Sequence, residues 1–166
     1  MFAALGLIPV NARADDVQRR EDQFKAAYLF NFVKFVEWPV TAPGDSVTIC
    51  FLGGAGVHEA LSSGIDAKRV GTRRLVARRL ERPAIVANCE VLYADAASVD
   101  HALAAGLPVL TVSDAPGFAT RGGMIELFTE NHRLRFVINV AHVHKAGLRI
   151  SSDLLKLAAS VQREEP

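Results

Sequence analysis

The sequence predicts an α/β protein, a layered fold with a central, largely parallel sheet flanked by helices. Short apolar runs alternate with short helical segments through the middle of the chain, which is the pattern of strand–helix–strand units. A long helix that is apolar around most of its circumference precedes them, and it needs a large apolar partner such as a sheet. Two strand-like runs joined by the turn-like Glu130–His132 segment add an antiparallel hairpin at one side.

The long helix is expected over Val17–Trp38. A polar start, QRREDQ, is followed by FKAAYLFNFVKFVEWP, in which apolar residues recur at helical spacing. Asn31, Lys34 and Glu37 form only a narrow polar strip, so this helix should bury more than one face. One face can cover the sheet, and the other needs a second partner inside the fold or on another chain. Pro39 ends the helix and favours extended backbone at the residue before it.

The middle of the chain predicts four strands and two short helices. The strands are expected at Val47–Leu52, Arg73–Arg82, Cys89–Ala94 and Pro108–Ser113. The helices are expected at Val57–Ser62 and at Ser98–Ala105, the second closed by Gly106 as a C-cap residue.

The last part of the chain predicts the hairpin and two more helices. The runs GGMIELFTE and LRFVINV form the hairpin strands. A short helix follows at Asn139–Lys145 and is closed by Gly147. The last helix is expected at Ser152–Val161, with Ser151 as its N-cap and Asp153 in its first turn.

The N-terminus fits the end of an export signal. Phe2–Val10 is a short apolar block, and Ala12-Arg13-Ala14 then matches the small-x-small pattern of a signal-peptidase site. No Lys or Arg precedes the block, and a frayed apolar N-terminus of a cytosolic protein is the alternative. We expect a signal-peptide remnant at residues 1–14 and a single α/β domain at 15–166, because 166 residues suit one domain. No other segment reaches the roughly 20 apolar residues that span a bilayer.

Net charge and cysteine count narrow the class of protein further. The formal net charge is +1, which gives no electrostatic reason to expect a nucleic-acid partner. The two cysteines are Cys50 and Cys89. They would be two buried thiols in a cytosolic protein and a disulfide in an exported one, where the bond would contribute about 3–4 kcal/mol.

The glycines of GGAG, Gly53 to Gly56, follow an apolar run and precede a helical segment, the outline of a phosphate-binding turn. The spacing does not fit G-x-G-x-x-G, because Glu59 stands where the third glycine would be. No Gly-Lys-Ser/Thr motif follows either. The pattern therefore favours a tight strand-to-helix turn over a nucleotide site.

A basic cluster lies just before and within the second predicted strand. Its members are Lys68, Arg69, Arg73, Arg74, Arg78, Arg79 and Arg82. It could bind an acidic partner, but charges that protect an edge strand from aggregation are the favoured interpretation.

Metal binding and catalysis find little support in the sequence. The histidines are His58, His101, His132, His142 and His144, and none lies in a metal-binding motif. Ser113 and Asp114 end a buried strand, a common place for active-site residues in α/β folds. They lack a G-x-S-x-G elbow, and with the following Pro116 and Gly117 they are typical of a turn. We expect no enzyme, no metal site and no cofactor.

Three stretches together resemble the YfiR family of bacterial periplasmic proteins. They are FKAAYLFNFVKFVEWP (Phe24–Pro39), VLTVSDAPGFATRGGMIELF (Val109–Phe128) and LRFVINVAHVHKAGLRISSDLLKLA (Leu134–Ala158). The segments VTICFLG and ANCEVLYA fit the same family between these blocks, so the resemblance covers Phe24 to Val161.

The resemblance implies a periplasmic negative regulator, not an enzyme. Proteins of this family bind the periplasmic sensor domain of an inner-membrane diguanylate cyclase of the YfiN type. They thereby lower cyclic-di-GMP output and biofilm formation. An outer-membrane lipoprotein of the YfiB type can sequester them, and dimers are known. The alternative is a periplasmic small-molecule-binding sensor that acts on another membrane signalling partner.

Residue by residue, the resemblance transfers one feature directly. Cys50 and Cys89 match a cysteine pair that forms a disulfide in the founding member of the family. A second pair of that member, in and after the strand that contains GGMI, has no counterpart here. A structural disulfide is therefore implied, and a second redox-active bond is not.

Two further sets of residues are candidates for binding. Large aromatics dominate protein interfaces, so the candidates for a partner or dimer surface are Tyr28, Phe32, Phe35 and Trp38, with ordinary core residues as the alternative. An α/β fold places ligands at strand ends, so the ligand-loop candidates are Ser113, Asp114, Gly117, Phe118, Gly122 and Gly123. A hydrolase that uses Ser113 and Asp114 is a third hypothesis.

Overall fold

The structure is a computed structural model that describes residues 10–39, 44–65, 67–81, 88–104 and 108–163. The helices are α1 (Val10–Phe35), α2 (Ala55–Ser62), α3 (Val99–Leu103), α4 (Val140–Lys145) and α5 (Ser152–Leu157). The strands are β1 (Val36–Glu37), β2 (Ser46–Leu52), β3 (Arg69–Val70), β4 (Arg73–Arg79), β5 (Val91–Ala94), β6 (Leu110–Ser113), β7 (Ile125–Glu130), β8 (Arg133–Asn139), β9 (Arg149–Ile150) and β10 (Ser160–Gln162).

The main sheet of the described residues is mostly parallel and has the order β10-β8-β7-β6-β5-β2-β4-β3. Strands β4, β2, β5, β6 and β7 run parallel to one another, whereas β3 and β8 are antiparallel to their neighbours β4 and β7. The predicted α/β class with a largely parallel sheet is therefore confirmed. Strand β2 lies between β4 and β5, so the chain leaves β2 toward one side of the sheet and later returns on the other.

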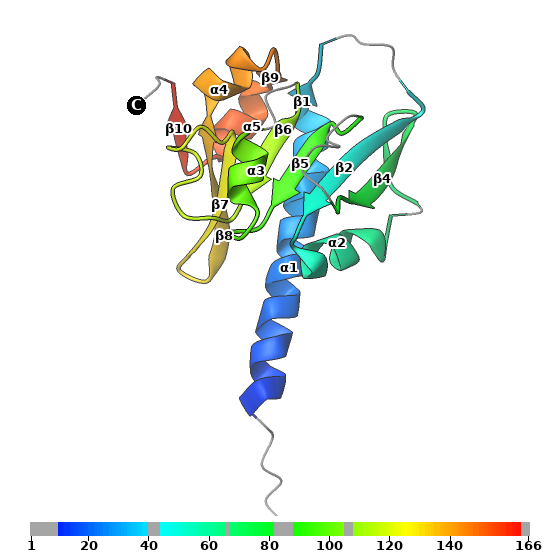
Figure 1. Cartoon of the computed structure of the whole chain (residues 1–166), viewed down its shortest axis with the longest axis vertical. Helices are drawn as coiled ribbons and strands as arrows, with labels where there is room; N and C mark the ends of the chain where they lie inside the picture. Colours follow the sequence, from blue (N-terminus) through cyan, green and yellow to red (C-terminus); the bar gives the residue numbers. More distant parts are fainter. Residues whose placement is uncertain (1–9, 40–43, 66, 82–87, 105–107, 164–166) are drawn as a thin grey trace, which may run out of the picture.

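Helices cover both faces of this sheet (Figure 1). The larger apolar core lies under α1 and α2 and contains Leu29, Phe32 and Leu61 together with Ile49 and Tyr93 from the sheet. A smaller core lies on the other face, where Val99 and Ala102 of α3 pack with the cysteine side chains and Phe118. Because α2 and α3 follow neighbouring strands yet cover opposite faces, the point between β2 and β5 is the topological switch point of the sheet.

The first helix differs from its prediction at both ends. It begins at Val10 and runs through Ala14, the last residue of the predicted signal-peptide remnant. It ends at Phe35, because Val36 and Glu37 leave the helix to pair with Ile150 and Arg149 of β9. Figure 1 shows the N-terminal part of α1 projecting well below the sheet, and its residues 13–20 are exposed.

The C-terminal elements follow the prediction up to α5. The hairpin β7–β8 is confirmed, with its turn at Asn131 and His132, both in the left-handed region of φ. Ser151 is the N-cap of α5 and accepts a hydrogen bond from the Leu154 backbone N–H. The predicted last helix is too long, since Ser160–Gln162 forms β10 and pairs in parallel with β8.

Two predictions about the middle of the chain need correction. The basic strand β4 is not the edge strand, because the two-residue strand β3 pairs antiparallel with its outer side. The disulfide residue Cys89 lies just before β5 instead of inside it. The C-cap residue Gly106 and the end of the predicted strand at Arg82 lie outside the described residues.

Candidate functional site

The disulfide links β2, in the middle of the sheet, to a residue just before the neighbouring strand β5. Cys50 lies in β2 and Cys89 lies just before β5, and the structure bonds them across 39 positions of sequence with their Cα atoms 5.8 Å apart. Both side chains are buried in the smaller core. The bond agrees with the pairing that the family resemblance implied, and the parallel register of β2 and β5 explains how two distant residues meet.

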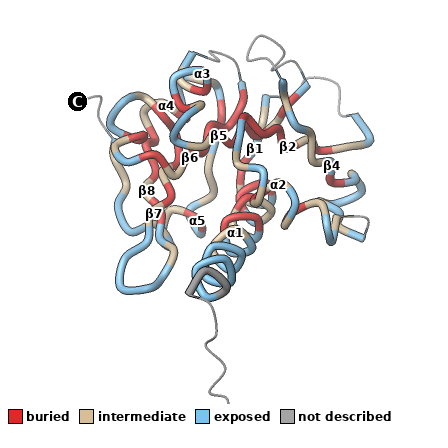
Figure 2. The backbone as a smooth tube through the Cα atoms, turned by 60° about the horizontal axis from the view of Figure 1, so that its bottom comes forward, coloured by how far each residue is buried: buried red, intermediate tan, exposed pale blue. Residues whose placement is uncertain are grey.

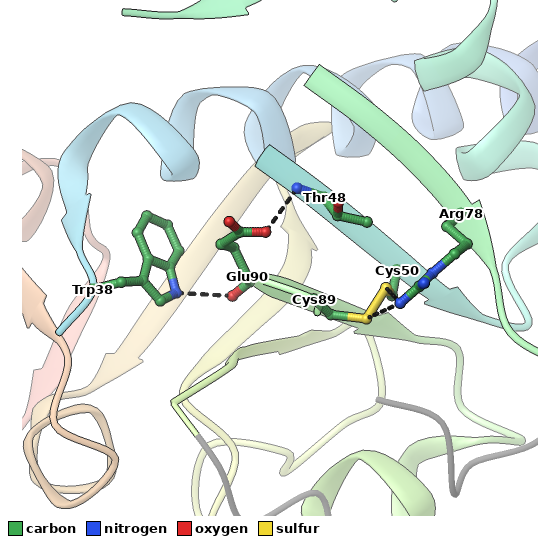
Figure 3. The surroundings of a disulfide bond; sticks show 6 residues. All are labelled: Trp38, Thr48, Cys50, Arg78, Cys89 and Glu90. Atoms are coloured by element: carbon green, nitrogen blue, oxygen red, sulfur yellow. Dashed lines mark hydrogen bonds between the residues drawn. A yellow bond between two sulfur atoms is a disulfide. The ribbon is translucent and has the colours of Figure 1, made fainter. Parts of the chain in front are cut away.

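An arginine lies directly over this disulfide (Figure 3). The Arg78 guanidinium Nη2 donates to Cys89 Sγ at 3.2 Å and to Cys50 Sγ at 3.5 Å. Arg78 projects from β4 on the face that carries the smaller core. At least one residue of the basic cluster therefore has a structural partner inside the sheet, which sequence reasoning did not predict.

Glu90 lies next to the disulfide, at the amino ends of β2 and β5, and it bonds to residues of three other segments. Its backbone oxygen accepts a hydrogen bond from Trp38 Nε1 at 3.0 Å, and its carboxylate Oε2 accepts one from the Thr48 backbone N–H at 2.8 Å (Figure 3). The Arg73 guanidinium also pairs with this carboxylate. Trp38 is half-buried. The hydrogen bond of its ring nitrogen attaches it to the sheet.

The glycine turn after β2 lies at the switch point, where α/β folds bind ligands. Gly53 and Gly54 have φ values of 71° and 59°, which side chains rarely tolerate. The Gly54 N–H donates to Asp95 Oδ2 at 2.9 Å, and a Cβ on Gly53 would overlap the same carboxylate. Asp95 Oδ1 also accepts from the Ser98 N–H at 3.0 Å. The chain's own carboxylate fills the anion position, which agrees with the expected tight turn.

Beside this turn, buried polar groups connect α1 to the ends of β5 and β6. The Lys25 ammonium donates to Asp114 Oδ2 at 2.6 Å and pairs with Glu21 at 2.8 Å. The Tyr93 hydroxyl donates to the same Asp114 oxygen at 3.0 Å. Lys25 and Tyr93 are buried, and this network fixes the middle of α1 over the carboxyl ends of the strands.

Both proton donors of this network hold their protons more tightly than usual. Burial raises the pKa of Tyr93 well above its ordinary value, and the negative charge of Asp114 and the hydrogen bond to it add to the rise. Burial alone would lower the pKa of Lys25. The hydrogen bonds to Asp114 and Glu21 and the charges of these carboxylates outweigh burial, so the pKa of Lys25 is raised.

The aromatic candidates on α1 fall into two groups. Phe32 is 0% exposed and packs against Phe136 of β8 with ring centres 5.2 Å apart, so it is a core residue and not part of a surface. Tyr28 is half-buried, and its hydroxyl donates to the Leu134 backbone oxygen at 3.1 Å. Phe35 is also half-buried. For Tyr28, Phe35 and Trp38 an interface role stays a prediction.

Sequence reasoning missed the most exposed apolar residues of the same helix. Phe24 is 60% exposed and Val17 is 65% exposed. Phe24 begins the apolar part of the helical pattern but is not among the four candidates for a partner surface, and Val17 is flanked by polar and charged residues in the sequence. Their spacing of seven residues, two helical turns, was the available sign that they share one face.

The six candidates for a ligand loop lie at the end of β6 and in the loop after it, but the chain uses their polar groups itself. Ser113 is fully buried, and its Oγ accepts a hydrogen bond from the Ala115 N–H. The Gly117 N–H donates to the Glu126 carboxylate at 3.0 Å. Phe118 is fully buried against Gly123, where a Cβ would overlap its ring. Gly122 faces His142, and Asp114 belongs to the Lys25 network.

The described part of the chain shows neither a metal-binding cluster nor a membrane-spanning helix. No group of three or more His, Cys, Asp or Glu side chains there could hold a metal ion. None of the helices within those residues is long and apolar enough to cross a membrane.

Comparison with known proteins places these features in a family. The chain is similar in structure to a conserved domain protein from Vibrio cholerae O1 biovar El Tor strain N16961, with 14% sequence identity and a TM-score of 0.58. The alignment covers 85% of this chain but only 60% of that one, and at this identity it shows the fold alone. None of the curated proteins matches the chain. The family model described as YfiR/HmsC-like matches residues 22–159, well over half of the 166 residues, and the chain therefore belongs to the YfiR/HmsC-like family.

Proposed function

We propose that this protein is a periplasmic repressor that binds the sensor domain of an inner-membrane diguanylate cyclase. By doing so it lowers cyclic-di-GMP signalling and biofilm formation. The observation that carries the proposal is the family match over residues 22–159. Membership of the YfiR/HmsC-like family supports a periplasmic regulator of cyclic-di-GMP signalling that interacts with a membrane partner.

The buried disulfide is consistent with this location. Disulfides persist in oxidising compartments such as the bacterial periplasm and are rare in the cytosol. Export with cleavage after Ala14 is part of the proposal. The mature helix α1 would then begin with Asp15 and Asp16, and acidic residues stabilise a helix N-terminus.

A non-catalytic role also agrees with the candidate residues. The family is regulatory, and Ser113, which a hydrolase would need as its nucleophile, is fully buried with its Oγ engaged by the Ala115 N–H. The glycine turn is filled by Asp95. Both observations favour protein binding over chemistry at these strand ends, and they argue against a ligand bound in the Ser113–Gly123 loop as the signal.

The proposed partners follow from the same family. They are the cyclase itself, an outer-membrane lipoprotein of the YfiB type that sequesters the repressor, and a second copy of this chain. No nucleic acid is among them, which agrees with the near-neutral net charge of +1.

The test measures cyclic-di-GMP in the host with and without this protein, together with capture of its partner from solubilised membranes. We expect loss of the protein to raise cyclic-di-GMP, and the captured membrane protein to contain a periplasmic sensor and a cyclase domain. Unchanged cyclic-di-GMP, with folded protein present in the periplasm, would refute the proposal in favour of a sensor that acts on another partner.

A further inference from the structure

Protection of a sheet edge does not explain all of the basic cluster. Charges on an edge strand prevent its pairing with other chains, which accounts for Arg69 of β3, the outermost strand on this side of the main sheet. Strand β4 is covered by β3, so its arginines need another explanation. Arg73 has one, because it forms an ion pair with Glu90. Arg74 is exposed, and edge protection leaves it unexplained.

Two arginines lie directly opposite each other on the β3–β4 hairpin. Arg69 and Arg74 are register partners next to the two-residue turn of Gly71 and Thr72. Directly opposite side chains share one face of a sheet, and like charges in such a pair are destabilising. The Arg69 guanidinium donates to the neutral Thr72 backbone oxygen at 2.7 Å. Neither arginine forms an ion pair with any of the described residues, so the hairpin holds two uncompensated positive charges side by side.

The same face of the sheet continues along β4. Arg74, Val76 and Arg78 alternate onto one side of the strand, and the contact of Arg78 with the disulfide shows that this is the side of the smaller core. Helix α3 packs on β5 and β6, and Figure 1 shows that no helix of the described residues lies in front of β4. Figure 2 likewise shows β4 at the margin of the molecule. Val76 is accordingly 38% exposed. We call Arg69, Arg74, Val76 and Arg78 the basic face.

The chemistry of the basic face decides which partner it fits. Its charged residues are all arginines, whose planar guanidinium groups bind carboxylates through paired hydrogen bonds. An apolar side chain between charged ones is typical of a protein interface. Recognition of anionic lipids typically uses clusters of roughly 4–8 basic residues, more than this face presents, and the net charge of the chain is only +1. An acidic polypeptide therefore fits better than a membrane surface.

We propose that the basic face is a docking surface for an acidic segment of a protein partner. Carboxylates of that segment lie against Arg69 and Arg74 and supply the negative charge that the fold itself does not, while an apolar side chain of the segment contacts Val76. The proposal rests on the proposed function in one respect. Family membership supports a membrane partner, and the basic face is assigned as the place where this partner binds.

The first experiment titrates the isotope-labelled protein with a short peptide of alternating glutamate and valine, blocked at both ends. We expect the amide chemical shifts of Arg69, Arg74 and Val76 to change and to saturate. Arg74→Glu should weaken binding at least about tenfold, because it replaces an attraction by a repulsion. Arg133→Glu is the matched control. Arg133 is also exposed, but it lies on β8 toward the other end of the sheet, so this variant should bind like the unchanged protein.

The same titration contains the results that would overturn the docking surface. They are unchanged shifts on β3 and β4, or an Arg74→Glu protein that binds like the Arg133→Glu control. Equal shifts with free glutamate at the same carboxylate concentration would indicate a simple anion instead of a segment. Binding to phosphatidylglycerol vesicles without binding to the peptide would indicate a lipid surface. Arg74→Gln verifies the like-charge pair, since relief of the repulsion should leave the melting temperature unchanged or higher. A clearly lower melting temperature would make Arg74 a structural residue.

The second experiment separates the docking surface from the repressor function. Host cells that lack the unchanged protein receive the Arg74→Glu or the Arg133→Glu variant. We expect cyclic-di-GMP to stay high with Arg74→Glu and to fall with Arg133→Glu. Full repression by a folded Arg74→Glu protein would overturn the assignment of the partner to this face and leave the proposed function intact. If loss of the protein itself leaves cyclic-di-GMP unchanged while the peptide still binds, the proposed function fails and the docking surface stands.

Discussion

The strand-end loops and the outer face of α1 differ in how the chain uses them. The Gly53–Gly56 turn and the Ser113–Gly123 loop have the residue types of binding loops, yet Asp95 and Glu126 satisfy their backbone N–H groups from within. The helix has the composition of a core element, yet it leaves Val17 and Phe24 in solvent. Residue type thus indicates a possible binding site. Whether a partner is needed depends on whether the chain itself supplies hydrogen-bond partners for the polar groups and buries the apolar ones.

The sharpest contrast is expected between two phenylalanines on the same helix. Phe32→Ala removes a fully buried ring that packs on Phe136, and it should lower the free energy of unfolding by about 3–5 kcal/mol. Phe24→Ala alters an exposed side chain and should change it by less than about 0.5 kcal/mol at concentrations where the protein is monomeric. Urea denaturation measures both, and equal effects would show that Phe24 is not on the surface.

Loss of the disulfide should have the next largest effect on the free energy of unfolding. It closes a loop across 39 positions, so the Cys50→Ala, Cys89→Ala double variant should lose about 3–4 kcal/mol of stability. The same urea titration measures this loss, and treating the unchanged protein with a reductant should reproduce it. A double variant as stable as the parent would mean that the segments of β2 and β5 stay close together in the unfolded chain even without the bond.

Removing the carboxylate that fills the glycine turn should lower stability by a smaller amount. Asp95→Ala removes the acceptor of the Gly54 and Ser98 N–H groups and should cost about 1–3 kcal/mol. Asp100→Ala on α3 is the matched control, since Asp100 is exposed and pairs with Arg121 at the surface, and it should cost at most about 1 kcal/mol. If the two aspartate variants unfold at the same urea concentration, Asp95 is not essential to the turn.

The network around Asp114 predicts a loss of stability in alkali. The pKa values of Tyr93 and Lys25 are raised in the folded state, so the unfolded chain loses these protons first as the pH rises. Their contribution is complete below the ordinary pKa values of about 10.0 and 10.5, and above them stability falls by up to about 1.4 kcal/mol per pH unit for each group.

Stability measured from pH 8 to about pH 11 tests this expectation. Tyr93→Phe keeps the buried ring but removes one of the two titrating groups, so its stability should fall less steeply above about pH 10. Tyr28→Phe serves as the control because Tyr28 donates to a backbone oxygen, and the alkaline slope should be retained. A Tyr93→Phe profile parallel to that of the unchanged protein would contradict the assignment.

The strands that sequence reasoning found are those with their own apolar pattern. Periodicity and turn residues predicted β2, the β7–β8 hairpin and the Ser151 cap, because these depend on neighbours in sequence. Strands β1, β3, β9 and β10 have two or three residues each and exist only through their pairing partners. The end of α1 at Phe35 follows from the same cause, since Val36 pairs with Ile150 far along the chain.

The candidate sites show the same limit. The disulfide came from the family resemblance, and the sequence alone did not show that β2 and β5 are neighbours. Asp95 lies 41 positions from Gly54, so no local pattern could reveal that it fills the turn. The exposure of Phe24 could not be predicted for another reason. An apolar residue at helical spacing is usually buried, and only the packed structure shows which side of the helix faces the core.

The way α1 is held has a consequence for when this protein can fold. Lys25 binds a residue 89 positions later, Tyr28 binds one 106 positions later, and the oxygen of Phe35 accepts the N–H of Ser151. Loops of this length must close before the helix gains its native packing, which makes folding slow. These three bonds of α1 therefore form only after the chain up to Ser151 is present, although α1 also packs against the nearby α2.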